Sequence, residues 1–211
     1  MIQKRHLPAQ LAGLRRGIWA DERAAQLVEF AVALPLLVLF VVGIFDFSGA
    51  YTLKQKLTNI TRDAARVAAS GPATDLSSTF AAGNAPASVV DAFNVIDNYL
   101  VVNQIRDCGV TASSVTTIGT LTWQYKVIPS GNPPCGITLT ISRGYVFPLT
   151  GTPPSVTCAS QSAGSGTAVV GTCISLQYTY SWRFGRISSL LGSSTTLPPQ
   201  ISATGVALNE N

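Results

Sequence analysis

Few side chains in this 211-residue chain are of the types that carry out catalysis. Its one histidine, His6, lies near the N-terminus, ahead of a long apolar run. The rest of the chain therefore holds no Ser-His-Asp, Cys-His or histidine-rich metal site. The carboxylates that follow Ser70 are scattered and form no acid–base set: Asp75, Asp91, Asp97, Asp107 and Glu210. Asp91 and Asp97 are expected in solvent, and Asp107 at a helix end or in a loop. The sequence thus predicts a protein that is not an enzyme and uses no metal or cofactor.

Four cysteines all follow the apolar run: Cys108, Cys135, Cys158 and Cys173. None forms a CxxC pair, so a zinc ribbon is not expected. An even number of cysteines in an exported domain indicates two disulfides, for which three pairings exist. We favour Cys108–Cys135 and Cys158–Cys173 because each closes a local loop. The alternative is four reduced thiols in a cytosolic protein.

The apolar run extends from Phe30 to Phe45 without a charged residue. As a helix it would measure about 24 Å, and its neighbours lengthen it to a transmembrane segment over about 27–47. Glu29 and Asp46 would then lie near the two membrane interfaces. Basic residues dominate residues 1–24, so this leader is expected in the cytoplasm and the C-terminal part outside. Beyond Asp46 the basic residues are scattered, so a nucleic-acid partner is not expected.

A cleaved signal peptide is the rival interpretation of the apolar run. However, the chain continues with a helical stripe at spacings of four, three, four and three residues: Leu53, Leu57, Ile60, Ala64 and Val67. Gly71-Pro72 then ends the pattern. The sequence therefore predicts one long helix over 25–71, apolar in its first half and amphipathic in its second, in which Pro35 should introduce a bend.

Residues 72–211 are expected to form an extracytoplasmic α+β domain. The segment "PASVVDAFNVIDNYLVVNQIRD" (residues 86–107) repeats Val89, Val90, Phe93, Ile96, Leu100 and Ile105 at near-helical spacing, which predicts a second, shorter helix. After Cys108 the pattern has a period of two, which indicates strands in "SSVTTIGTLTWQYKVIP" (one or two), "GITLTISRGYVFPL", "TCISLQYTYSWRF" and "PQISATGVALN". Strands that follow one another without long helices between them predict an antiparallel sheet.

The aromatic residues of these strands have two interpretations. They are more typical of a sheet core, but they could also line a carbohydrate-binding face: Trp123, Tyr125, Tyr145, Tyr178, Tyr180 and Trp182.

The stretch "DERAAQLVEFAVALPLLVLFVVGIFDFSGAYTLKQKLTNITRDAARVAA" resembles the N-terminus of TadE-like proteins, the minor pilins (pseudopilins) of tight-adherence pilus systems. The chain's end, "ISATGVALNEN", resembles the family's last strand. The resemblance implies a processing site at which prepilin peptidase cuts between Ala24 and Ala25, leaving Glu29 as the fifth mature residue, followed by Phe30. The family has Gly where this chain has Ala24. Gly17 and Glu22 offer the same spacing, but Arg23 follows Glu22 in place of an aromatic residue.

The resemblance further implies that the chain is first inserted in the bacterial inner membrane and is then assembled at a pilus base or tip, where other pilus subunits bind through the N-terminal helix. In that setting Glu29 would pair with the α-amino group of a neighbouring subunit; otherwise it is an ordinary residue of the membrane interface. The sequence accordingly predicts a structural pilus component for assembly or surface adhesion. The alternative is a permanently anchored extracytoplasmic scaffold, or a domain that binds carbohydrate or protein.

Overall fold

A computed structural model of the chain describes residues 22–77, 83–147, 158, 169–182 and 198–210. The chain forms two compact units, Met1–Asp46 and Phe47–Asn211, of which the second is the sheet unit. His6 and most of the basic leader lie outside the described residues.

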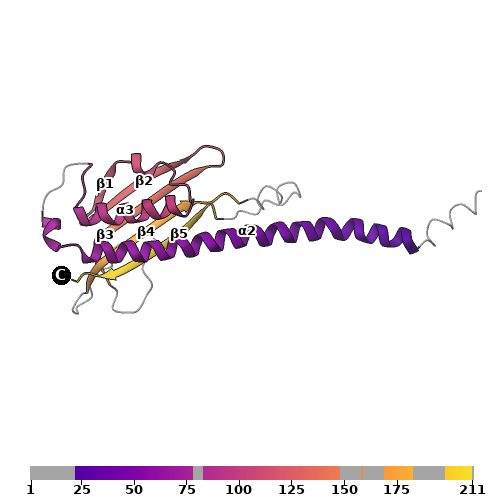
Figure 1. Cartoon of the computed structure of the whole chain (residues 1–211), viewed down its shortest axis with the longest axis horizontal. Helices are drawn as coiled ribbons and strands as arrows, with labels where there is room; N and C mark the ends of the chain where they lie inside the picture. The colour runs from indigo at the N-terminus through magenta and orange to yellow at the C-terminus, as the bar shows by residue number, and fades with distance from the viewer. Residues whose placement is uncertain (1–21, 78–82, 148–157, 159–168, 183–197, 211) are drawn as a thin grey trace, which may run out of the picture. The chain divides into compact units, whose positions relative to one another are not determined.

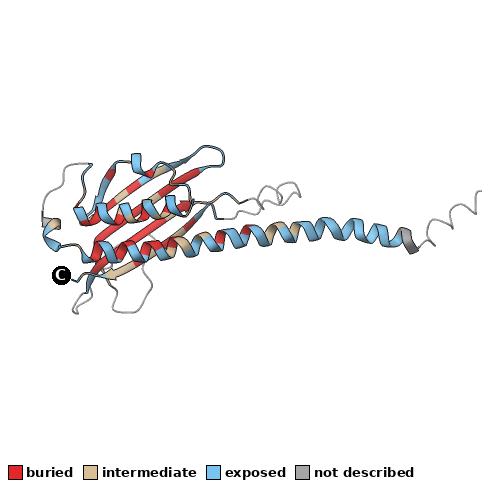
Figure 2. Ribbon diagram, viewed as in Figure 1, coloured by how far each residue is buried: buried red, intermediate tan, exposed pale blue. Residues whose placement is uncertain are grey.

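Helix α2, Glu22–Ser70, belongs to both units and confirms the predicted long helix. From Ala25 to Phe45 its side chains are exposed or half-buried, although most of them are apolar (Figure 2). Among the described residues, α2 is the one helix long and apolar enough to cross a membrane. It therefore fits a single-pass membrane anchor.

The sheet unit contains five antiparallel strands in the order β1-β2-β3-β4-β5, so each strand pairs with its neighbour in the chain (Figure 1). The strands are β1 (Val115–Gly119), β2 (Thr122–Ser130), β3 (Cys135–Val146), β4 (Val170–Thr179) and β5 (Gln200–Leu208). The predicted α+β class and antiparallel sheet are confirmed, and the first predicted strand segment is two strands.

Helix α3, Ala87–Val102, packs with the second half of α2 against one face of this sheet. The predicted second helix was expected to extend to Asp107, but it ends earlier. Gln104 has a φ of 56°, and its N–H and that of Ile105 donate to the carbonyl oxygens of Val101 and Leu100. This pair of hydrogen bonds is a Schellman motif, which ends a helix. Two short 3₁₀ helices, η2 (Ala73–Ser77) and η3 (Val110–Ala112), flank α3.

The buried stripe of α2 differs from the predicted one at its end. Leu57, Ile60 and Ala64 are buried as expected, but Val67 is 37% exposed and Ala68 is fully buried instead. The predicted stripe repeats every 3.5 residues on average, whereas a straight helix has 3.6 residues per turn. The predicted positions therefore move off the buried face within a few turns. Val90, included in the predicted stripe of α3, is 38% exposed, because it lies about 100° around the helix from the buried Val89.

Small residues bring the backbone of α2 directly onto β5. A Cβ added at Gly205 would lie 2.4 Å from the carbonyl carbon and oxygen of Thr61 and 2.5 Å from the backbone nitrogen of Arg62. Lys54 Nζ donates a hydrogen bond to the carbonyl oxygen of Ser202 on the same strand. The helix and the strand are therefore in contact through backbone atoms, which leaves no room for a side chain at position 205.

A buried guanidinium joins the ends of the helices to the sheet. Arg143 of β3 is 1% exposed, and its Nη2 donates to the carbonyl oxygen of Gly71, 3.0 Å away, just after α2 ends. Its Nη1 lies 3.7 Å from Oδ1 of Asp75 in η2. Burial lowers the pKa of Arg143, and the Asp75 carboxylate opposes that shift. Asp75 Oδ2 in turn accepts the N–H of Ser88 in the first turn of α3. One charge pair thus holds four elements together.

We predict that Gly205→Ala destabilises the sheet unit, because the added methyl must push α2 away from β5. Overpacking of this kind costs about 1–3 kcal/mol. The melting temperature of the full chain in detergent, followed by tryptophan fluorescence, measures the effect. Gly119→Ala is the matched control, since its added Cβ would have no neighbour closer than 3.7 Å. Equal melting temperatures for the two variants would contradict the close approach of α2.

Arg143→Met is predicted to reduce the free energy of unfolding by about 3 kcal/mol, because it removes the ion pair with Asp75 and one hydrogen bond to the Gly71 carbonyl. Asp75→Asn should also destabilise, and the double variant should lose less than the sum of the two single losses. Urea unfolding of the four proteins measures this coupling. Additive losses would show that the pair does not act as one unit.

Candidate functional site

The predicted processing site lies in the first turns of α2. Ala24 and Ala25 belong to these turns, and Ala25, Glu29 and Phe30 are exposed. Ala25 and Glu29 are four residues apart, so they share one face of the helix. Their accessibility suits both a peptidase and a neighbouring helix, and the cleavage itself stays a prediction. Gly17 of the other register lies outside the described residues.

The two carboxylates that flank the apolar run differ in their surroundings. Both were expected near membrane interfaces. Glu29 is exposed, whereas Asp46 is 5% exposed and interacts with other groups of the chain. Asp46 therefore serves the structure of this chain, while Glu29 is accessible to another molecule.

Both disulfides have the pairing favoured from the sequence. Cys108–Cys135, with Cα atoms 5.4 Å apart, joins the segment after α3 to the start of β3. Cys158–Cys173, with Cα atoms 5.6 Å apart, packs with Tyr145 in a cluster separate from the main core. All four cysteines form disulfides, so none is a free nucleophile. The bridges therefore cross-link the sheet unit.

The aromatic residues of the strands mostly belong to the core. Trp123, Tyr125, Tyr145 and Tyr178 are each at most 9% exposed, and burial raises the pKa of all three tyrosines. The two later aromatics are half-buried and pack on each other, with ring centroids 4.9 Å apart: Tyr180 and Trp182. The described strands therefore present no row of exposed aromatic rings of the kind that would bind a carbohydrate.

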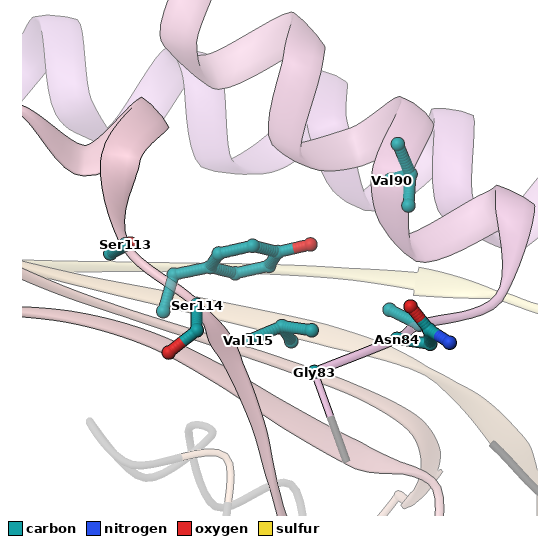
Figure 3. A pocket seen from close by; sticks show the side chains of 8 residues that line it. Gly83, Asn84, Val90, Ser113, Ser114 and Val115 are labelled. Atoms are coloured by element: carbon teal, nitrogen blue, oxygen red, sulfur yellow. The ribbon is translucent and has the colours of Figure 1, made fainter. Parts of the chain in front are cut away.

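A pocket of about 470 Å³ lies between the start of α3 and the edge strand β1 (Figure 3). Tyr125 lines it and stacks on Phe93, with ring centroids 4.3 Å apart. The other lining residues are small, polar or aliphatic: Gly83, Asn84, Ala85, Val90, Ser113, Ser114 and Val115. This lining offers hydrogen bonds and one aromatic ring but no carboxylate, histidine or basic group. It can hold a small neutral group.

The described residues also include no group of three His, Cys, Asp or Glu side chains that could hold a metal ion. Arg143 and Asp75 form a buried ion pair in the sheet unit that was not predicted from the sequence. A signal for Arg143 exists, because it is the one charged residue in a strand segment that otherwise alternates between apolar and hydroxyl side chains.

Asp97 of α3, expected in solvent, is half-buried, and its Oδ1 has no hydrogen-bond partner. Burial and then the negative charge of Asp107 raise the pKa of Asp97 above 3.8. The folded state therefore binds this proton more tightly than the unfolded state does. The resulting stability is present at low pH and is lost as the pH rises through the folded-state pKa.

We therefore predict that Asp97→Asn raises the melting temperature at pH 7 and that the gain disappears in acid, below the unfolded-state pKa of Asp97. Thermal unfolding between pH 3 and pH 8 measures both effects. Asp91→Asn, at an exposed position of the same helix, should change little. A gain for Asp97→Asn that is the same at every pH would argue against titration of the carboxyl group.

Comparison with known protein families gives a match over most of helix α2. The family model described as TadE-like protein matches residues 24–66, which include Ala24, Ala25, Glu29 and Phe30 and most of the helix that packs on the sheet. No curated protein and no solved structure matches the chain. Over residues 24–66 the chain thus resembles TadE-like proteins, and the resemblance of its N-terminal stretch is confirmed. The resemblance of the chain's end to the family's last strand stays a prediction.

Proposed function

We propose that this chain is a minor pilin of a tight-adherence pilus, anchored in the bacterial inner membrane before it assembles. The observation that carries this proposal is helix α2, one element with two roles. Its first half exposes an apolar surface, and its second half is a core helix of the sheet unit. Such a helix can be held by lipid in one state and by neighbouring α2 helices in the other.

The orientation follows from charge and cysteine chemistry. Basic residues precede the apolar run: Lys4, Arg5, Arg15, Arg16 and Arg23. An excess of positive charge marks the cytoplasmic side of a membrane segment. Both disulfides lie in the sheet unit, and disulfides persist outside the reducing cytoplasm. The N-terminus is therefore assigned to the cytoplasm and the sheet unit to the outside.

We assign to Glu29 a contact that holds neighbouring subunits together in the assembled pilus. After cleavage by prepilin peptidase between Ala24 and Ala25, each subunit would carry a new α-amino group at residue 25. An exposed Glu29 on a neighbouring helix is a suitable acceptor for that amine. In a low-dielectric helix bundle neither charge is stable alone, so the pair would fix the axial register of the two subunits.

A second function is supported by the pocket beside Tyr125. A permanently anchored scaffold or binding protein would retain its leader and use this site, of about 470 Å³, for a ligand. Mass spectrometry of the protein taken from its own membrane distinguishes the two functions. A mature chain that begins at Ala25 supports the pilin, and an intact Met1 supports the anchored scaffold.

We predict that Glu29→Ala leaves membrane insertion and both disulfides unchanged but prevents assembly. The partner amine would be buried without its counter-charge, at a cost of about 3 kcal/mol or more, which corresponds to a loss of roughly a hundredfold or more in association. Co-purification with other pilus subunits, compared with the amount in the membrane, measures this loss.

Asp63→Ala is the matched control, because it removes an exposed carboxylate from the same helix, within the sheet unit. Its co-purification should match that of the unmodified chain. Normal membrane levels together with normal co-purification of Glu29→Ala would assign Glu29 to the membrane interface alone and favour the anchored scaffold.

A further inference from the structure

One end of the sheet unit, here called the Phe47 end, collects its most exposed apolar side chains. Val102 is 79% exposed, Ile128 73%, Tyr51 65% and Val101 61%. The other large apolar side chains that are exposed in the described part of this unit have values between 37% and 57%. Exposed apolar side chains that gather in one place mark an interaction surface.

The end of α3 and the β2–β3 hairpin lie together at this end. The Cys108–Cys135 disulfide joins the segment after α3 to the first residue of β3. Arg106 Nη1 also donates to the carbonyl oxygen of Pro133 within the hairpin, 3.5 Å away. Val102 is the last residue of α3, and Ile128 lies near the end of β2, just before the β2–β3 turn. The two most exposed apolar residues are thus held on neighbouring segments.

The same end carries the first residues of the sheet unit. In the sheet, Ile137 pairs with Tyr178, so the C-terminal end of β4 lies beside the hairpin. Just beyond it, the Tyr180 hydroxyl lies 3.1 Å from where a Cβ at Gly49 would be. The Trp182 ring centroid is 5.3 Å from that of Phe47. Val102, Ile128 and Phe47 therefore belong to one end of one unit.

Chain connectivity identifies what covers this end. Phe47 follows directly on Asp46, the last residue of the unit that holds the apolar run. If that run spans a membrane, the peptide bond between them keeps the Phe47 end next to the membrane surface, whatever the angle between the units. Tyr51 and Trp182 are residue types that favour this interface. The basic side chains Arg106 and Lys126 are exposed nearby, beside a half-buried Asp107, and such cations attract acidic phospholipids.

We propose that the Phe47 end rests on the membrane, with Val102 and Ile128 in the lipid headgroup layer. The proposal depends on the membrane anchor of the proposed function and adds to it a second contact with lipid. This contact would fix the orientation of the sheet unit before assembly, and it would have to be released when the subunit leaves the membrane.

Site-specific fluorescence of the full chain in vesicles tests the proposal. The native cysteines are all paired, so a fluorophore can be attached to Val102→Cys, Ile128→Cys, Leu37→Cys in the apolar run, or Leu208→Cys at the exposed end of β5. The vesicles contain phosphatidylglycerol and a lipid with a nitroxide quencher, either at the headgroup or deep in the acyl chain. We expect headgroup quenching at residues 102 and 128, deep quenching at residue 37, and none at residue 208.

Each alternative outcome has one meaning. Quenching at residue 37 but not at residues 102 and 128 would overturn the lipid contact and leave the anchor intact. A blue shift at residues 102 and 128 without quenching would mean that protein, such as a second copy, covers the surface, and would also overturn it. Absence of quenching at residue 37 would contradict the membrane anchor itself, and with it the proposed function.

Discussion

A buried positive charge organises the sheet unit. The Arg143 side chain is almost completely removed from solvent, so its guanidinium must be paired within the protein. Its partners are the Gly71 carbonyl and the Asp75 carboxylate. Gly71 has no space for a side chain, because a Cβ there would come within 2.6 Å of Ser88 Cβ. The end of α2, the helix η2 and the start of α3 are therefore fixed on β3 through one residue. From there α3 runs back along the sheet in the direction opposite to α2 (Figure 1).

The same helix that fits a membrane anchor is also part of the folded core. Small side chains and Gly205 allow the backbone of α2 to approach β5 closely, so the sheet unit cannot detach from α2 without losing its core. A force or register change applied to α2 is consequently transmitted to the sheet. For a subunit that assembles through this helix, such coupling keeps the sheet unit in a fixed relation to the helix segment from Ala50 to Ala69, which is buried against it.

The site residues predicted from the sequence are brought together only in part. Ala25 and Glu29 lie one turn apart on an exposed helix, Phe30 follows Glu29 directly, and the favoured cysteine pairs are formed. Asp46 and Asp97 are more buried than the sequence predicted, and local charge gave no sign of this burial. The pocket beside Tyr125 had no sequence signal, since its lining comes from a turn, a helix and two strand segments that are separate in the chain.

The sequence by itself determined the helices, the strands, their antiparallel order and the even use of cysteine. These features depend on periodicity, turn residues and spacing, which act between residues close in the chain. The tertiary structure alone decided that Arg143 binds the end of α2, 72 positions away, and that Gly205 contacts the backbone at Thr61. It also decided that Ala68, and not Val67, faces the core. The physical reason is that burial and close approach depend on which distant residues of the folded chain contact a given position. The pattern of neighbouring residues in the sequence does not contain that information.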